Sequence, residues 1–121
     1  MTEYKPPLND IRLVLKEISD ISRLCDLPDY EHVDVETVDG VIEELGRFAA
    51  EVISPVNKIG DQEGCSVADG VVTMPKEFGE AWNHFIDAGW GAISQDPDYG
   101  GGGFPLAIHT CLLYTSPSPR D

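Results

Sequence analysis

The residues nearest to a binding loop are 89–105, GWGAISQDPDYGGGGFP, because a run of glycines leaves many backbone N–H groups able to meet an anion. Residues 89–94 approach the GxGxxG dinucleotide fingerprint, but that fingerprint follows a strand, and here a helical pattern precedes it. The four glycines at 100–103 lack a following GK[ST] and lie beside two aspartates, whose charges repel phosphate. We therefore expect no nucleotide site.

A flexible linker is the second interpretation of this stretch, and large side chains argue against it. Trp90, Tyr99 and Phe104 bracket the glycines, whereas flexible linkers are rich in glycine and serine without large aromatic residues. Pro97 and Pro105 stiffen the two ends of the glycine run. We expect a compact turn, pinned by the aromatic residues, that leads into a new helix at Pro105 and uses glycine for positive φ and close approach.

Other side chains that could bind a metal or act as nucleophiles are scattered along the chain. They are Cys25, Cys65, Cys111, His32, His84 and His109. No CxxC pair and no histidine at ligand spacing is present, so we expect free, reduced thiols and no metal site. The carboxylates Glu43, Glu44 and Glu51 share a helical segment and are interpreted as an exposed helix face, not as catalytic groups.

The overall charge is strongly negative. The 121 residues include 22 acidic and 8 basic side chains, giving a formal net charge of −14, which repels nucleic acids and anionic membranes. No apolar run approaches the roughly 20 residues that a membrane span needs, and the first residues carry no secretory signal pattern. We expect one modest cytoplasmic domain without a nucleic-acid or membrane partner.

Apolar periodicity predicts an all-α fold. A first helix is expected over about 9–24, with Asn9 or Asp10 as its cap, and a longer one opens at Asp34. Pro55 predicts a kink or break near Ser54, because proline lacks the N–H that a helix uses. The one β-like piece, residues 71–73, is too short for a sheet alone.

A third helix is expected after Pro75, with Thr73 as a candidate cap and Gly89 at the C′ position. Its apolar face gives the strongest core signal in the chain, so we expect truncation of Trp82 to destabilise the fold severely. The residues of this face are Phe78, Ala81, Trp82, Phe85 and Ile86.

Several motifs in combination resemble a known family. AGWGAI followed by DPDYGGGGFP resembles the N-terminal helical domain of the flavin-dependent acyl-CoA dehydrogenases. Upstream, YKPPLNDIRLVLKEI, VDGVIEELGRFAAEVISPVNKIGDQEG and DGVVTMPKEFGEAWNHF are similar to the subgroup with an extra N-terminal helical segment, which includes the methylmercaptopropionyl-CoA dehydrogenases. The resemblance covers residues 1 to about 110. It implies an extension helix over 1–33 and an incomplete N-terminal helical bundle over 34–110.

The resemblance also implies a division of chemical roles. In that family the catalytic glutamate and most FAD contacts lie in later domains, so no catalytic or cofactor-binding residue is expected here. The parent protein would oxidise an acyl-CoA, pass electrons to an electron-transfer flavoprotein and form a homo-oligomer. The loop before the next helix would support one wall of the substrate pocket. Its residues are Tyr99, Gly100, Gly101, Gly103 and Phe104.

Residues 111–121, CLLYTSPSPRD, depart from the family and resemble a translated transposase adapter from sequencing-library preparation. A helix from Pro105 would soon meet the prolines at 117 and 119, exposing Leu112, Leu113 and Tyr114. We expect this tail to be non-native and outside the fold.

Three other identities stay open. A free-standing acidic helical module that binds a protein partner is the alternative from another class. Within the family, a flavin-dependent acyl-CoA oxidase and a DNA-damage-inducible acyl-CoA dehydrogenase homologue are nearer rivals.

Overall fold

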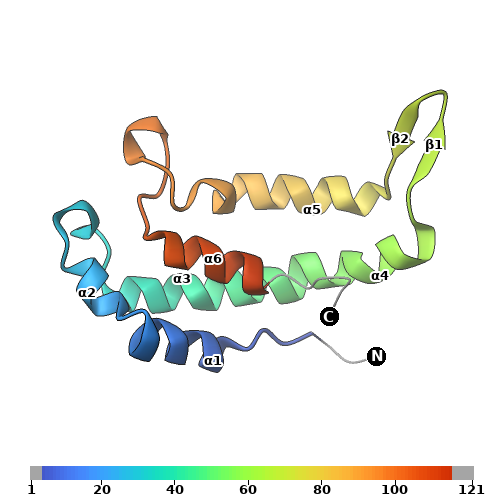
Figure 1. Cartoon of the computed structure of the whole chain (residues 1–121). Coiled ribbons are helices and arrows are strands. Elements are labelled where there is room, and N and C mark those ends of the chain that lie inside the picture. Colours follow the sequence, from blue (N-terminus) through green and yellow to red (C-terminus); the bar gives the residue numbers. More distant parts are fainter. Residues whose placement is uncertain (1–3, 116–121) are drawn as a thin grey trace.

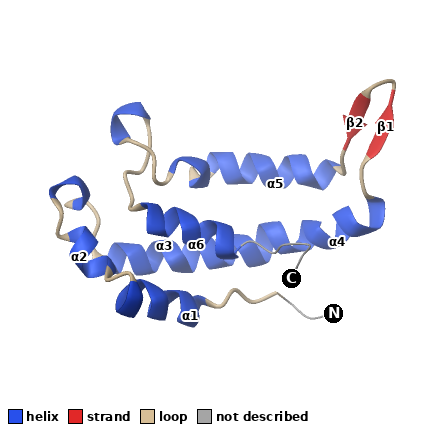
Figure 2. Cartoon of the chain, viewed as in Figure 1, coloured by secondary structure: helices blue, strands red, loops and turns tan. Residues whose placement is uncertain are grey.

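The longest helical path runs through α3 (Val35–Phe48), a π-helical turn (Ala49–Ile53) and α4 (Ser54–Glu63). In the computed structural model, which describes residues 4–115, α1 (Leu8–Leu13) and α6 (Leu106–Thr115) pack on α3, while α5 (Lys76–Asp87) packs on α4 (Figure 1). The chain is mostly helical, with one small sheet beyond the paired ends of α4 and α5 (Figure 2). The other elements are a π-helical turn (Val14–Ile18), α2 (Ile21–Cys25), β1 (Ser66–Ala68), β2 (Val71–Thr73) and short 3-10 helices at Pro28–Tyr30, Trp90–Ala92 and Pro97–Tyr99.

The first predicted helix is present but divided. It begins at Leu8 directly after Pro7, with no side-chain cap, so the expectation of Asn9 or Asp10 as cap is wrong. The Leu8 N–H instead donates to the Pro6 carbonyl oxygen at 2.8 Å, so the two prolines form the turn that leads into the helix. The helical path then breaks at Asp20, whose φ of 47° is left-handed, before α2 begins.

α3 begins where the sequence predicts. The Asp34 carboxylate accepts a hydrogen bond of 2.6 Å from the Thr37 backbone N–H, which satisfies a donor that has no partner inside the helix. Beyond this cap, α3 presents its apolar residues along one face, and Ile42 and Leu45 are completely buried.

The predicted interruption near Ser54 takes another form. The chain stays helical through Pro55, which lies in the first turn of α4, so the expected break is wrong. A π-helical turn immediately precedes it. Because π-helical bonds reach one residue further back, this turn shifts the hydrogen-bond register just before the residue that cannot donate.

The small sheet corrects a second expectation. Residues 71–73 do not stand alone but pair antiparallel with β1, Val67 opposite Val72. The two-residue connection is Asp69–Gly70, with φ of 52° and 76°. Asp-Gly is a strong signal for a tight hairpin turn, and it lies in the sequence where the missed strand ends.

Both ends of α5 can be compared with the prediction. Pro75 precedes its first residue, and no side chain caps it, so Thr73 as cap is wrong. Thr73 is instead the last residue of β2, paired with Ser66. At the other end Gly89 has a φ of 76°, which confirms its predicted C′ role.

The core lies between α3, the N-terminal helices and α6, not on α5. Trp82 and Ile86 are 60% and 52% exposed, so the expectation that they form the main core is wrong, although Ala81 is buried. An amphipathic pattern indicates that a helix face needs a partner but does not place that partner. The buried cluster comprises Ile11, Leu15, Ile21, Val33, Val38, Ile42, Leu45, Ile93, Ile108, Cys111 and Leu112.

The start of the tail also departs from expectation. α6 continues to Thr115, and Cys111 and Leu112 are buried, so their exclusion from the fold and the exposure of Leu112 are wrong. Leu113 is 67% exposed, as expected. The Tyr114 side chain and residues 116–121 lie outside the described part. α6 packs along α3, which gives these apolar side chains a surface to cover.

Two global expectations can be compared with the described residues. Cys25, Cys65 and Cys111 are free, as predicted, and burial raises the thiol pKa of Cys25 and of Cys111. Within residues 4–115, no helix is long and apolar enough to cross a membrane.

The Asp34 cap gives a prediction about pH. The Thr37 N–H holds the pKa of the Asp34 carboxyl below its ordinary value. Because the folded-state pKa is lower, the cap stabilises the protein above the unfolded pKa of about 3.9 and loses this effect as the pH falls through the folded-state pKa. We expect Asp34→Ala to lower the thermal midpoint at pH 7, and the difference from wild type to shrink as the pH falls through the folded-state pKa of the carboxyl. Asp34→Asn, which still accepts the bond, is the control, and equal midpoints for Asp34→Ala and wild type at pH 7 would contradict the assignment.

The location of the core gives a second prediction. Leu45→Ala should lower the free energy of unfolding by about 2–5 kcal/mol, because its side chain is fully enclosed. Trp82→Ala should cost about 1 kcal/mol or less, because most of that ring already meets solvent. Urea unfolding followed by circular dichroism measures both variants. A larger loss for the Trp82 variant than for the Leu45 variant would place the core on α5.

Candidate functional site

Residues 89–105, called the glycine loop below, fold back on themselves through backbone hydrogen bonds. The N–H groups of Gly102 and Phe104 donate to the carbonyls of Ala92 and Ile93 at 2.9 and 3.0 Å. The Gly103 N–H donates to the Gln95 carbonyl at 2.9 Å. The segment is therefore a rigid turn that folds back on itself. This confirms the compact-turn interpretation and excludes a flexible linker.

The tip of the loop is closed by one aspartate. The Asp96 carboxylate accepts the Asp98 N–H at 2.9 Å, and the Asp96 carbonyl accepts the Gly101 N–H at 3.0 Å. Gly100 follows with a φ of 86°, a conformation that side chains other than glycine rarely adopt. Because several N–H groups of the loop are already bonded internally, they are not free to bind a phosphate.

Close approach explains why the middle of the loop is glycine. A Cβ on Gly101 would overlap the Gln95 carbonyl oxygen. A Cβ on Gly103, where φ is 63°, would lie 2.8 Å from the Pro97 ring and 2.9 Å from the His32 ring. Backbone at Gly101, and the rings of Pro97 and His32 at Gly103, therefore occupy the space that a side chain would need.

The three aromatic residues of the loop behave differently. Trp90 packs near Phe48 of α3, with ring centres 6.2 Å apart, and Phe104 meets the edge of His32. Tyr99, in contrast, is 90% exposed, so the expectation that it pins the turn is wrong. The backbone N–H groups of all five predicted site residues donate within the loop, and the exposed Tyr99 side chain marks its solvent-facing tip.

The structure adds polar groups that sequence reasoning missed. His32 Nε2 lies 3.1 Å from the Gly102 carbonyl oxygen, although the two residues are 70 positions apart. Trp90 Nε1 and His109 Nδ1 are buried with no hydrogen-bond partner among the described residues. Nothing in the sequence spacing could have paired His32 with the loop, since a contact of that range depends on the tertiary fold.

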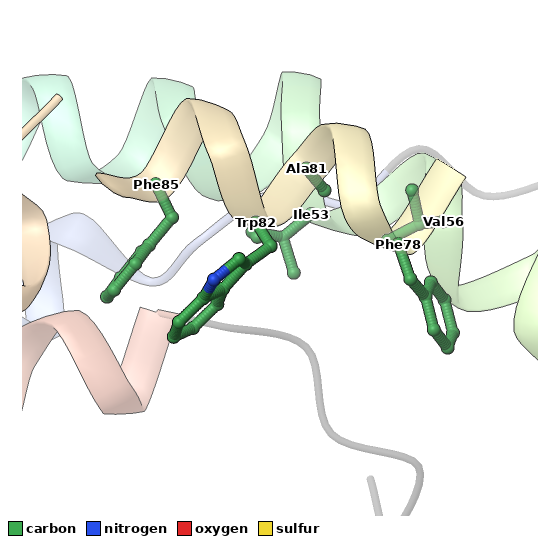
Figure 3. Close-up of a pocket in the computed structure, with 6 residues that line it drawn as sticks. All are labelled: Ile53, Val56, Phe78, Ala81, Trp82 and Phe85. Atoms are coloured by element: carbon green, nitrogen blue, oxygen red, sulfur yellow. The ribbon is translucent and has the colours of Figure 1, made fainter. Parts of the chain in front are cut away.

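A second concave feature lies between α4 and α5. It is an open groove of about 290 Å³ into which the rings of Trp82 and Phe85 project, stacked 5.4 Å apart (Figure 3). Its lining residues are all hydrophobic, with the indole N–H of Trp82 as a polar group, so the lining offers no acid, base or nucleophile for catalysis. The lining residues are Ile53, Val56, Phe78, Ala81, Trp82 and Phe85.

The carboxylates of α3 lie at the surface, as predicted. Arg12 bonds both Asp39 and Glu43 at 2.5 Å, which ties α1 to α3 and raises the pKa of Arg12, chiefly through Glu43. Arg47 pairs with Glu44 at 3.0 Å. In the described part of the chain no group of three His, Cys, Asp or Glu side chains could hold a metal ion.

Comparisons with known proteins point to one family. No family model matches the chain. It is 31% identical to the 3-methylmercaptopropionyl-CoA dehydrogenase of Ruegeria pomeroyi over 87% of its own length. It is 25% identical to the broad-specificity linear acyl-CoA dehydrogenase FadE5 of Mycobacterium tuberculosis over 98% of its length. The chain spans 18% and 20% of these two relatives, so it corresponds to about one fifth of each.

The glycine loop gives a third prediction. Gly101→Val should lower the free energy of unfolding by about 1–3 kcal/mol, because the new side chain meets fixed backbone. Gly40→Ala is the matched control, since a Cβ there meets nothing within 4 Å and alanine favours the helix by about 0.5–1 kcal/mol. Chemical denaturation measures both. A Gly101 variant as stable as wild type would remove close packing as the reason for glycine.

Proposed function

We propose that this chain is the N-terminal helical part of an FAD-dependent acyl-CoA dehydrogenase. In this proposal the whole protein oxidises an acyl-CoA to the enoyl-CoA, passes its electrons to an electron-transfer flavoprotein, acts in the cytoplasm and assembles as a homo-oligomer. The single observation that carries the proposal is the likeness to two acyl-CoA dehydrogenases along 87% and 98% of the chain. The mostly helical fold agrees with it.

The proposed domain organisation follows the helices. Residues 1–33 would be the extension of the methylmercaptopropionyl-CoA dehydrogenase subgroup, and 34–110 would begin the helical bundle. The Asp34 cap, at which α3 opens, supports this boundary. We propose that residues 111–121 derive from adapter sequence. The burial of Cys111 and Leu112 is consistent with that origin. Apolar side chains at these positions of α6 would face α3 whatever the source of the sequence.

We propose that residues 4–115 do not supply the groups that such a reaction needs. Acyl-CoA oxidation requires a carboxylate that removes an α-proton and a flavin that accepts the β-hydride. The carboxylates of α3 are at the surface, and the groove between α4 and α5 is lined only by apolar residues. Two buried unpaired nitrogens, in Trp90 and His109, do not make a flavin site. FAD is therefore proposed for the whole protein.

The proposed contribution of this chain to the substrate pocket is structural. The glycine loop ends at the buried Pro105, where α6 begins. We propose that the loop fixes the entry of α6 and so supports one wall of the acyl-CoA pocket. The residues proposed for this support are Tyr99, Gly100, Gly101, Gly103 and Phe104.

The exposed apolar face of α5 supports the view that the domain is part of a larger protein. Trp82 and Ile86 meet solvent beside a groove lined by hydrophobic residues. Contiguous apolar surface of this kind marks an interaction site in soluble proteins. In the proposal, later parts of the same polypeptide cover it.

The same groove favours the second candidate function, an acidic helical module that binds a separate protein. An apolar groove between helices accepts an amphipathic helix of a partner, and a net charge of −14 would attract a basic one. The two candidates differ in what covers the groove.

The test compares this chain with the longer protein encoded at its natural locus. We expect the 121-residue chain to purify without flavin, and the longer protein to bind about one FAD, which an acyl-CoA substrate bleaches. Absorbance between 350 and 500 nm measures both. A natural stop codon close after residue 110, or flavin bound by the short chain at a ratio near one, would contradict the proposal.

A further inference from the structure

His32 touches the glycine loop in several ways. It lies between the 3-10 helix Pro28–Tyr30 and α3, and its Nε2 is 3.1 Å from the Gly102 carbonyl oxygen. Its ring meets Phe104 edge-on, with centres 6.5 Å apart and planes at 83°. It also lies so close to Gly103 that a Cβ there would come within 2.9 Å of Nε2.

The chemistry of the contact fixes its direction. A carbonyl oxygen only accepts, so Nε2 must carry the proton and donate it to Gly102. Both the imidazolium and one neutral tautomer carry a proton on Nε2. The Gly102 N–H is already used, since it donates to the Ala92 carbonyl at 2.9 Å. The N–H and the carbonyl of Gly102, which belong to neighbouring peptide units, thus contact different segments of the chain.

The consequence follows from the rigidity of the loop. Its backbone hydrogen bonds join residues 92, 93 and 95 to residues 102, 104 and 103, so one outside contact to this bonded unit can set the position of the turn. His32 supplies such a contact from the segment that leads into α3 through the buried Val33. Two residues after Gly103, the buried Pro105 begins the turn into α6, where the Ile108 N–H donates to the Pro105 carbonyl at 2.9 Å.

We propose that His32 is a positioning residue for α6: by donating its Nε2–H to Gly102, it fixes where the glycine loop sits and so where α6 enters the core. The link joins residues 1–33 to the proposed pocket wall, and it rests on the proposed function only in assigning the loop to that wall. The histidine does not touch reacting atoms. It acts through the backbone of Gly102.

The test uses the 121-residue chain in solution, without flavin or acyl-CoA. In His32→Leu the donor is lost, so we expect the Gly102 carbonyl ¹³C resonance to shift and the Gly103 and Phe104 amides to exchange about two- to tenfold faster. In His32→Gln an amide N–H can replace the donor, so both readouts should return towards wild type. His84→Leu is the matched control, because His84 is exposed on α5.

Two outcomes would overturn the proposal. One is a Gly102 resonance and exchange rates in His32→Leu that equal those of wild type. The other is a His32→Gln variant that stays like His32→Leu, because ring packing alone would then explain the contact. His32 is exposed, so the leucine variant should fold, and far-UV circular dichroism checks this. Neither outcome bears on flavin binding by the longer protein, so the two proposals fail separately.

Discussion

The contact between α3 and α6 is the constraint on which the rest of the structure depends. Ile42 and Leu45 of α3 and Ile108 of α6 are completely buried, although α6 follows α3 by more than 50 residues. For α6 to reach this surface, the chain must turn sharply after α5, and the glycine loop provides that turn. Burial of these side chains supplies the main favourable free energy, and the loop supplies the geometry.

The structure has a closed side, which holds the core, and an open side, which holds the apolar groove, and this difference bears on function. α1, α3 and α6 enclose a core, whereas α5 covers only part of α4 and leaves Trp82 and Phe85 beside an open groove. Exposed apolar surface of this kind favours association. Under the proposed function, later parts of the longer protein cover the open side, whereas in the alternative a separate protein partner covers it.

Sequence reasoning succeeded at several positions that are decided locally, although the caps expected at Asn9 or Asp10 and at Thr73 are wrong. The Asp34 cap and the left-handed conformation of Gly89 each depend on a few neighbouring residues, so the sequence alone predicts both. The turn at Asp69–Gly70 is equally local, but the strand before it, Ser-Val-Ala, has fewer strand-favouring residues than the Val-Val-Thr strand after it. The rigid character of the glycine loop was also predictable, because proline and glycine restrict or free the backbone in known ways.

It failed where the answer depends on what packs against an element. Apolar residues in a sequence do not show what will cover them: Trp82 on the amphipathic face of α5 is exposed, whereas Leu112 at the start of the tail is buried. The contact of His32 with Gly102 spans 70 positions and leaves no periodic trace. The most direct test of the open side uses Trp82 as sole tryptophan in this chain and in the longer natural protein. Trp90 is replaced by Phe in both, and so is every tryptophan of the longer protein outside this chain. The account predicts red-shifted, readily quenched emission in the short chain and blue-shifted, protected emission in the long one, and equal exposure of Trp82 in both would contradict it.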